Sequence, residues 1–445
     1  MSSPEPTLAS LAASISDAAN AIAKYLEDNG HPAPSFQEEG LERYPKDPQL
    51  MGLRFQLIEA TSDLYHMALG PEDMAFMQPL FWNHDTMIMD IINQFDFFSA
   101  VPLGGSASYG EIASKTNLPE SIVRRVIRHA MTMRLFEEKP PGSGSITHTS
   151  TTAFMARYPI WRSWLGHNFE DVRPGTVYVP ESLSKFSAGR DKPSEDILNS
   201  GIALADVDHL GHPISPWEYI DRTPEGKPDG YRANRFAEAM QIAASTSAVK
   251  APDLLAAFDW NSFGEATVID VGGSAGHDAL ALAESFPALK FIVQDLQQNQ
   301  AKFQSNLPPA MASRVSYEVH NFFNPQPTTA DVYFLKMVLH DWPNKDACSI
   351  LRNLVPSLKP GARILLCENV VPPAHDGHGN RTMPVMAQRM LSAADLQMLT
   401  AFNSMERTLD EWKALFKEAD ENLEVRSVFT VPGAFQSIIE LVLKA

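Results

Sequence analysis

Residues 266–277 read Ala-Thr-Val-Ile-Asp-Val-Gly-Gly-Ser-Ala-Gly-His. A β-branched apolar run ends in Asp270 and Val271, a glycine-rich turn follows, and a helical pattern continues from Asp278 to Phe286. Glycines let the backbone turn sharply and come close to a ligand, and free N–H groups collect where a helix begins. This order predicts the first strand, loop and helix of an open α/β sheet that binds a nucleotide-like ligand.

Two acids narrow the kind of ligand. Asp295 ends the run Phe291-Ile292-Val293-Gln294, about 20 residues after Gly276, where an acid can accept both hydroxyls of a ribose. Asp270 ends its own strand and suits a cationic or amine-bearing ligand better than a pyrophosphate, whose charge it would repel. No Gly-Lys-Ser/Thr follows the glycines, so a P-loop is excluded.

Short apolar strands alternate with helices from Pro252 onward, which predicts an α/β fold with a mostly parallel sheet. The strands are expected near 267–271, 290–294, 315–320, 331–335 and 363–369. Two more, near 424–430 and 436–443, are expected to form a terminal hairpin-like pair.

Composition excludes several roles. The 445 residues suggest two or three domains, and the net charge of −18 disfavours binding to nucleic acid or to an anionic membrane surface. The sequence contains no apolar run long enough for a membrane span and no metal site is predicted. Its N-terminus lacks the basic residues of a targeting peptide, and two cysteines fit a reducing compartment, so we expect a cytoplasmic protein.

The N-terminal third is predicted to be helical. Apolar residues recur at helical spacing over 8–26, a polar linker covers 27–40, and a second helix runs from Leu50 to near Gly70. Residues 74–98 are rich in Met, Phe and Ile and predict a buried helix. Because these apolar segments exceed what one small domain can bury, we expect an obligate homodimer.

Residues 108–148 predict a helix, a turn, a second helix and two short strands, the order of a winged helix. The second helix holds four basic side chains, Arg124, Arg125, Arg128 and His129. They could form a DNA recognition helix or the solvated face of a packing module. The acidity of the chain favours the packing module.

His340, Glu368 and Glu406 are the candidates for acid–base chemistry. His340 follows the fourth predicted strand, at the edge where open sheets bind ligands, and a neutral imidazole there can take a proton from a phenol or alcohol. Glu368 is expected to end the next strand, where a carboxylate would fix the tautomer of the imidazole. The structural alternatives are a helix-capping histidine, a surface acid and, for Glu406, a helix start marked by the Thr408-x-x-Glu411 capping box.

On these residues the chain resembles the S-adenosylmethionine-dependent O-methyltransferases that methylate plant phenolics and fungal polyketides. The Asp-Val-Gly-Gly-x-x-Gly loop of that family matches 270–276, and its His-Asp-Trp motif matches 340–342. Its first orienting Glu follows the His by 28 residues, as Glu368 does here, and its Lys/Arg-Glu-Arg-Thr segment matches Met405–Thr408, which places the second Glu at Glu406. The match covers roughly residues 45–445.

The resemblance implies a winged-helix dimerisation domain joined to a Rossmann-like catalytic domain. An N-terminal helix and linker would occupy 1–45, the dimerisation domain 46–155, a helical connector with substrate-pocket residues 156–250, and the methyltransferase domain 251–445. It also implies S-adenosyl-L-methionine as the cofactor and a small hydroxyl compound, aromatic or polyketide-derived, as the substrate.

The resemblance assigns roles to individual residues. His340 would be the general base, oriented by Glu368 and Glu406. The cofactor would contact Asp270, Gly272, Gly273, Gly276, Asp295 (ribose), Asn321, Phe322 (adenine) and Lys336, and the substrate would contact Phe236 and Met240. The chain departs from the family pattern at two sites: Asn321 replaces an Asp that accepts from the adenine amino group, and the pair Asn403-Ser404 replaces Gly-Gly, as in the fungal branch.

Three other functions stay open at this point. A pericyclase or dehydratase on the same scaffold would use the positive charge of the cofactor and the shape of the pocket without transferring a methyl group, and the complete set of His340, Glu368 and Glu406 argues against it. A winged-helix regulator would bind DNA, which the acidic chain disfavours. A cofactor-binding partner protein without activity fits poorly with a complete catalytic set.

Overall fold

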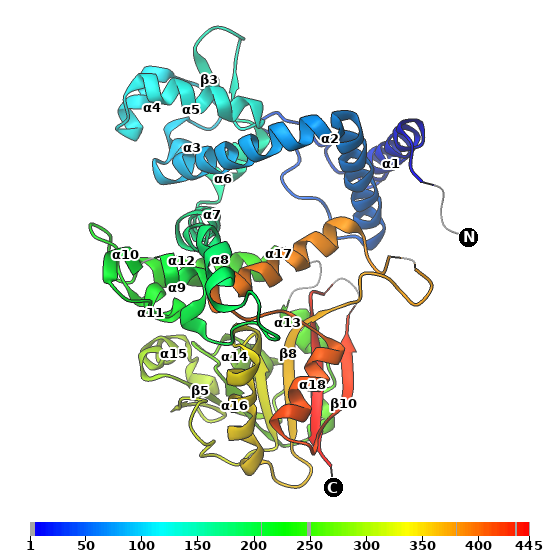
Figure 1. Cartoon of the computed structure of the whole chain (residues 1–445), viewed down its shortest axis with the longest axis vertical. Helices are drawn as coiled ribbons and strands as arrows, with labels where there is room; N and C mark the ends of the chain where they lie inside the picture. Colours follow the sequence, from blue (N-terminus) through cyan, green and yellow to red (C-terminus); the bar gives the residue numbers. More distant parts are fainter. Residues whose placement is uncertain (1–4, 206, 247–250, 380, 432–433, 445) are drawn as a thin grey trace. The chain divides into compact units, whose positions relative to one another are not determined.

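The computed structural model describes residues 5–205, 207–246, 251–379, 381–431 and 434–444. The chain divides into two compact units (Figure 1). The first, here called the N-terminal unit, consists of Met1–Arg173, Ile220–Ile242 and Met383–Arg389. The second, the sheet unit, consists of Pro174–Tyr219, Ala243–Thr382 and Met390–Ala445. Each unit therefore combines segments that are far apart in the sequence.

The described part of the sheet unit contains an eight-stranded sheet in the order β10-β11-β8-β7-β4-β5-β6, with β9 beside β8. The parallel strands are β4 (Thr267–Val271), β5 (Lys290–Asp295), β6 (Val315–Val319), β7 (Val332–Lys336), β8 (Arg363–Val371) and β9 (Arg407–Thr408). β10 (Leu423–Thr430) and β11 (Gln436–Leu443) form an antiparallel pair on β8. The predicted α/β sheet and its terminal pair are confirmed.

One strand differs from its prediction. We expected Glu368 to end a strand, but β8 continues to Val371 and pairs there with β9. The prediction was wrong because the apolar run stops at Cys367, while polar Glu368 and Asn369 stay in the strand through hydrogen bonds of their own. Glu368 is consequently completely buried and is not a surface acid.

Alternate residues of the central strands supply two cores. Tyr333 and Leu335 of β7 pack with α16 (Asn344–Leu354) and α18 (Leu409–Ala419). Val332 and Phe334 pack on the other side with Trp260, α13 (Ala251–Ala257) and α14 (His277–Ser285). Both faces of the sheet are thus covered by helices, which is why its parallel strands are apolar on both faces. Polar groups are left to the strand ends, where such sheets bind ligands.

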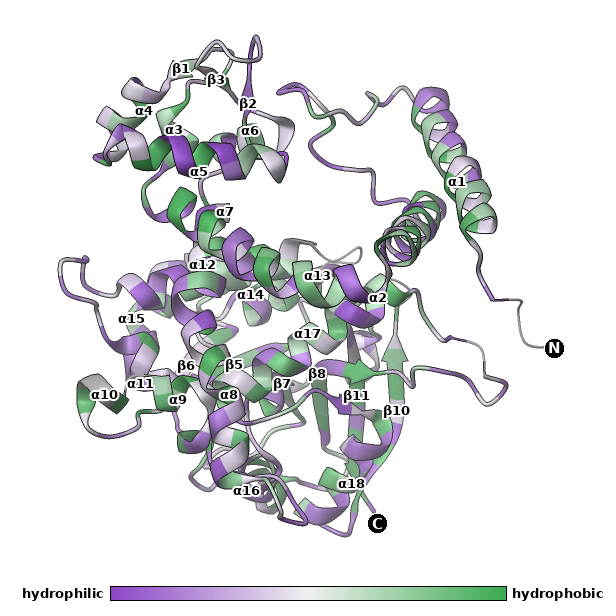
Figure 2. Ribbon diagram, turned by 45° about the horizontal axis from the view of Figure 1, so that its top comes forward, coloured by the Kyte–Doolittle hydropathy of each residue, from purple (hydrophilic) through white to green (hydrophobic). Residues whose placement is uncertain are grey.

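In the N-terminal unit, α1 (Leu8–Asp28) packs along α2 (Pro48–Gln94). Hydrophilic and hydrophobic residues alternate along α1 in Figure 2, as the helical spacing predicted. The predicted stop near Gly70 is a kink within α2, where Gly70 has φ 74° and ψ 167° and Pro71 follows. A positive φ of this kind favours glycine because it has no Cβ.

The predicted burial of residues 74–98 is wrong for the first half of this segment. Phe76 is 74% exposed and Trp82 57%, and Leu80, Phe81 and Met87 are exposed too. Apart from Gln78, the buried residues of this segment begin at Ile88, where α2 meets the core that also contains Phe97 and Phe98 of α3 (Phe97–Ala100). Composition alone cannot distinguish a helix that is buried by its own chain from one whose apolar side chains remain exposed.

The expected helix–turn–helix with two strands is confirmed as α4 (Tyr109–Thr116), α5 (Glu120–Thr132), β2 (Glu137–Glu138) and β3 (Ser145–Thr147), with β1 (Ala107–Ser108) completing a small sheet. Arg124 binds Glu120 and lies over the ring of Tyr109, and His129 contacts Asp85 at 2.8 Å. Two of the four basic side chains are thus engaged within the chain, which favours the packing module over a DNA recognition helix.

The remaining helices of six residues or more are α6 (Ser150–Arg157), α7 (Trp161–Gly166), the π-helix η1 (His167–Val172), α8 (Arg173–Phe186), α11 (Pro216–Asp221), α12 (Tyr231–Thr246), α15 (Gln300–Asn306) and α17 (Val385–Phe402), as far as the described residues extend. None of the helices found there combines the length and apolar character needed to cross a membrane.

Candidate functional site

The predicted residues of the sheet unit gather at the carboxyl ends of its parallel strands. The glycine loop follows β4, Asp295 ends β5, and His340 lies in a 3₁₀ turn, η6 (Leu339–Asp341), shortly after β7. A Cβ placed on Gly272 would lie 3.1 Å from the Cγ2 of Val338 and 3.7 Å from the ring of Phe322. The glycine loop, the turn that carries His340 and the predicted adenine residue therefore converge.

The glycine loop has no room for larger residues. Gly272 and Gly276 have φ values of 75° and 76°, a region that favours glycine. A Cβ on Gly273 would overlap the carboxylate of Asp270, and one on Gly276 would lie 2.7 Å from the ring of Phe303. The loop is thus shaped by the absence of side chains at all three predicted positions.

Most of the loop N–H groups are already bonded, contrary to the expectation that they would be free. The N–H groups of Gly272 and Gly273 donate to the carbonyl of Gln294, and that of Gly276 donates to the carbonyl of Gly273. The N–H of Ser274 donates to Asp295 at 2.7 Å. A phosphate would need such donors, so the loop is suited to a ligand recognised by shape and by the nearby carboxylates.

Asp270 is the buried acid of this loop. Its side chain is only slightly exposed, and its Oδ2 atom has no hydrogen-bond partner among the described residues. Burial, helped by the nearby carboxylates of Asp278 and Asp295 and opposed by Lys336, raises the pKa of Asp270 to about 8. A buried oxygen without a donor is costly in the free protein, so the carboxylate is well placed to receive a cationic group from a ligand.

The other predicted cofactor residues have intramolecular partners. Lys336, at the end of β7, forms an ion pair with both oxygens of Asp278 at 2.7 Å. Asp295 accepts from the N–H groups of Ser274 and Leu296 and from Asn299. Asn321 is exposed and its Oδ1 accepts from the N–H of Phe323, so one of its two lone pairs is already used.

His340 is held by carboxylates on both of its ring nitrogens. Nδ1 lies 3.0 Å from Oε1 of Glu406, and Nε2 lies 3.4 Å from Oδ1 of Asp341. Glu406 is fixed in turn by Asn369, which donates to the same oxygen, and by Asp395, which accepts from the N–H of Glu406. The imidazole therefore has one firmly placed nitrogen and one that faces a longer, weaker contact.

Glu368 acts at a different point from the one predicted. Its Oε1 accepts from the N–H groups of Val338 and Leu339, at 3.0 and 2.8 Å, and makes no hydrogen bond to His340. The prediction that Glu368 fixes the tautomer directly is wrong, because β8 carries this side chain toward the backbone after β7. Glu406 makes the contact with the ring, and the capping box of Thr408 and Glu411 at the start of α18 exists beside it.

The backbone of the histidine turn is held from three sides. Ser404 donates to the carbonyl of His340 at 2.7 Å. Arg407, completely buried, donates to the carbonyls of Leu339 and Trp342. Asn403 has φ 54°, which asparagine tolerates better than most residues, and donates to the carbonyls of Ser194 and Asp196. The Asn403-Ser404 departure from Gly-Gly thus keeps the turn and adds polar contacts.

Charge governs the titration of this cluster. Burial alone would lower the pKa of His340, but Asp341, Glu406 and Glu368 together raise it to about 10. Burial raises the pKa of Glu368 to about 7 and that of Asp341 to about 6, although His340 opposes both shifts. In the free protein the imidazolium form of His340 is therefore favoured near neutral pH.

Sequence reasoning missed several of these groups. Asp341 was part of the quoted His-Asp-Trp motif but received no role, and Asn369 follows Glu368 directly. No sequence pattern pointed to a separate role for Arg407 or Ser404.

The predicted substrate residues Phe236 and Met240 lie on α12 in the N-terminal unit, where Phe236 is half-buried and Met240 is 36% exposed.

The site fits the predicted cofactor. The orphaned Oδ2 of Asp270 would accept from an amino group, and the space left by the three glycines would admit the chain that carries it. Asp295 retains lone pairs for hydroxyl groups, since a carboxylate has about four acceptor positions. Phe322, half-buried beside the loop, offers an apolar surface for a base.

Comparisons with known proteins agree with this chemistry. A profile of the O-methyltransferase domain matches residues 212–420. The chain is 35% identical to the O-methyltransferase VdtC of Byssochlamys spectabilis over 98% of both chains. Among solved structures it is similar to OxaC (20% identity, TM-score 0.73, 98% of this chain and all of that one) and to LepI in complex with SAM (20% identity, TM-score 0.69, 97% and 100%).

The buried acid predicts a pH effect. Because the pKa of Asp270 rises from 3.8 to about 8 on folding, the folded chain holds an extra proton between these values, and stability falls as pH rises through them. Asp270→Asn should flatten this fall in thermal unfolding of the ligand-free protein. It should also weaken S-adenosylmethionine binding by about 1–3 kcal/mol in calorimetry, since the cationic amino group loses a charged acceptor and keeps only a neutral amide oxygen.

Asp331→Asn is the matched control. Asp331 starts the opposite end of β7, and although burial opposes it, Lys359 and the N–H of Thr267 hold its pKa below the usual value. This variant should lose stability above the acidic range and keep its cofactor affinity. Equal affinity in Asp270→Asn and the unmodified protein would remove Asp270 from the cofactor site.

Proposed function

The chain belongs to the family of S-adenosylmethionine-dependent O-methyltransferases, and from this premise we propose that it methylates a hydroxyl of an aromatic or polyketide-derived secondary metabolite, with His340 as the general base. The observation that carries the proposal is the placement of His340. Its Nδ1 is occupied by Glu406, while its Nε2 has only the 3.4 Å contact with Asp341. Nε2 is thus the nitrogen that an acceptor hydroxyl can approach.

The residues divide the work as follows. S-adenosylmethionine, when bound, supplies an electrophilic methyl group on a positively charged sulfur. Asp270 and Asp295 hold the cofactor, and His340 removes the proton of the hydroxyl as its oxygen attacks. Glu406 keeps the proton on Nδ1 and stabilises the imidazolium that forms. Glu368 fixes the turn on which His340 sits.

The raised pKa of His340 has two consequences. A strong base takes the proton of a phenol readily, but only the neutral fraction of the imidazole can act. The rate should therefore increase with pH toward the pKa of about 10. The carboxylates around the ring make the neutral imidazole a stronger base. They also reduce the fraction of His340 that is neutral near pH 7.

The pericyclase alternative differs in its product. LepI and OxaC are both about equally similar in fold, and at 20% identity neither likeness decides the reaction. Incubation with methyl-labelled S-adenosylmethionine and a panel of naphthols and hydroxynaphthoic acids separates the two functions. A labelled product one methyl group heavier supports the methyltransferase, and a rearranged product without label supports the pericyclase.

His340→Gln should lower kcat by about 10²–10⁴-fold, because general-base assistance is lost, and should leave the calorimetric affinity for S-adenosylmethionine nearly unchanged. His129→Gln, which alters a histidine of the N-terminal unit that pairs with Asp85, is the control and should keep full activity. Normal turnover in His340→Gln would rule out this histidine as the base.

Glu406→Gln should move the pKa of His340 downward, because its hydrogen bond and its charge both favour the imidazolium. An NMR titration of the His340 ring in the ligand-free protein measures this without an acceptor. The rising limb of the pH–rate profile should shift to lower pH while the maximal rate falls. A pKa that stays in place or rises would contradict the assigned contact.

We also propose that the chain is a homodimer formed through α2. The exposed apolar side chains Phe76, Leu80, Phe81, Trp82 and Met87 support this, since monomers rarely leave so many large apolar groups exposed on one segment. A second copy would cover them.

Phe76→Arg with Trp82→Arg should shift the protein from dimer to monomer in sedimentation velocity, because each added charge would be buried in the interface. Val177→Arg, an equally exposed position on α8 of the sheet unit, should leave the assembly unchanged. A stable micromolar monomer of the unmodified chain would contradict the proposal.

A further inference from the structure

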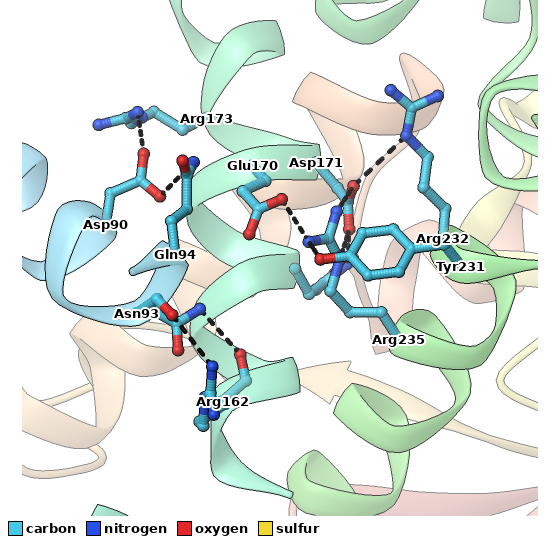
Figure 3. A network of polar contacts seen from close by, with 11 residues as sticks. Asp90, Asn93, Gln94, Arg162, Glu170, Asp171, Arg173, Tyr231, Arg232 and Arg235 are labelled. Carbon is cyan, nitrogen blue, oxygen red and sulfur yellow. Dashed lines mark hydrogen bonds and ion pairs between the residues drawn. The ribbon is translucent and has the colours of Figure 1, made fainter. Parts of the chain in front are cut away.

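Outside the histidine cluster, the side chain of Arg235 has an extensive set of polar contacts. It comes from α12, and its guanidinium lies against two consecutive carboxylates, Glu170 and Asp171 (Figure 3). Nε donates to Asp171 at 2.9 Å, Nη2 donates to the other oxygen of Asp171, and Nη1 contacts Glu170 at 2.6 Å. Arg235 and Asp171 are both buried. This is a bidentate pair with a third carboxylate contact, an arrangement that only the planar fork of arginine satisfies.

The carboxylates depend on an unusual backbone. Glu170 and Asp171 belong to the π-helix η1 (His167–Val172), which continues α7 and leads into α8. Consecutive residues of an α-helix point about 100° apart, and the wider i→i+5 turn narrows this angle, so that both acids can reach one guanidinium. Single π-helical turns of this kind occur frequently at functional sites.

The absence of a side chain at Gly166 leaves space for the side chain of Arg235. A Cβ on Gly166, the last residue of α7, would lie 2.8 Å from the Cδ of Arg235 and 3.0 Å from its Nη1. The ring of Tyr231, one turn earlier on α12, lies 4.7 Å from the guanidinium carbon and its hydroxyl accepts from Nη1. The two carboxylates, the π-helical backbone that presents them and the space beside Gly166 therefore all hold the side chain of Arg235 in one position.

This contact sets the rotation of α12. Phe236 follows Arg235 directly, and its ring meets that of His167 edge to face at 5.6 Å. Met240 lies one turn beyond Phe236 on the same face, whereas Ala239, one turn beyond Arg235, is completely buried. A change in the seating of Arg235 would turn or shift the face that carries Phe236 and Met240.

We propose that Arg235, seated between Glu170 and Asp171 of the π-helix, is a positioning residue that determines acceptor specificity through Phe236 and Met240. The inference rests on the proposed function and adds to it that these two side chains, which the resemblance assigns to the substrate, contact the acceptor. The predicted cofactor residues and the histidine cluster belong to the sheet unit. None of the interactions described above for Arg235 involves them. Loss of the Arg235 contact therefore changes acceptor binding and spares cofactor binding.

Two variants disturb the contact in different ways. Arg235→Lys keeps the charge and removes the fork, and Gly166→Ala adds one methyl group against Arg235 and removes no charge. Arg157→Lys is the matched control, because Arg157 also faces two carboxylates, Glu42 at 2.6 Å and Glu38 at 3.5 Å, but lies on α6. The acceptor is the best methylated member of the panel of naphthols and hydroxynaphthoic acids.

Both test variants should raise KM for the acceptor about tenfold and change kcat little, because a small misplacement of binding groups weakens binding before it affects chemistry. Their calorimetric affinity for S-adenosylmethionine should equal that of the unmodified protein, and Arg157→Lys should change neither value. Unchanged KM in both variants, or a parallel loss of kcat and cofactor affinity, would overturn the proposal.

A second readout does not require an acceptor. Hydrogen–deuterium exchange should show faster exchange in peptides from 167–172 and 231–246 of both variants, and unaltered exchange around β7 and β8. Exchange that rises throughout the chain would mean general destabilisation and would overturn the positioning role. If the unmodified protein methylates no member of the panel, the proposed function fails, and the exchange pattern alone decides whether Arg235 positions α12.

Discussion

The site depends on one buried carboxylate that bonds to backbone. Oε1 of Glu368 accepts hydrogen bonds from the N–H groups of Val338 and Leu339, the first residues after β7 that leave the sheet. These two bonds set the direction of the chain just before His340, and they place Val338 against Gly272 of the glycine loop. Met337 immediately before them has φ 52°, a conformation that persists only where its surroundings enforce it. The position of His340 is thus fixed by hydrogen bonds from the turn to a strand of the sheet.

Around this turn the protein concentrates acids in a buried place. Asp341, Glu368 and Glu406 face one imidazole, and Asp270 lies buried in the neighbouring loop. Buried carboxylates without full compensation are unfavourable in the free protein. The same charges are complementary to a ligand that carries a sulfonium and an amino group. The free protein thus gives up some stability in favour of affinity for such a ligand, and the raised pKa values of Asp270 and Glu368 reflect the cost of burying these acids.

Much of this could be predicted from spacing. The strand pattern, the glycine loop and the positions of His340, Glu368 and Glu406 follow from periodicity and from family motifs, because parallel strands end at one edge. Which carboxylate meets the ring could not be predicted, since it depends on the length of β8 and on the course of the chain before Arg407. The bonded N–H groups of the loop and the exposed face of α2 were missed for a similar reason: sequence patterns do not report which groups already have partners.

The division of the chain into units that share segments has a consequence for its synthesis. Residues 220–242 and 383–389 belong to the unit that begins at the N-terminus, and residues 174–219 belong to the other. Domains generally fold as units while the chain emerges from the ribosome. Here the first unit cannot be completed until residue 389 has left the exit tunnel, by which time most of the sheet has been made. Neither unit corresponds to one continuous stretch of the chain, so neither could be expressed alone or exchanged between proteins as a single segment.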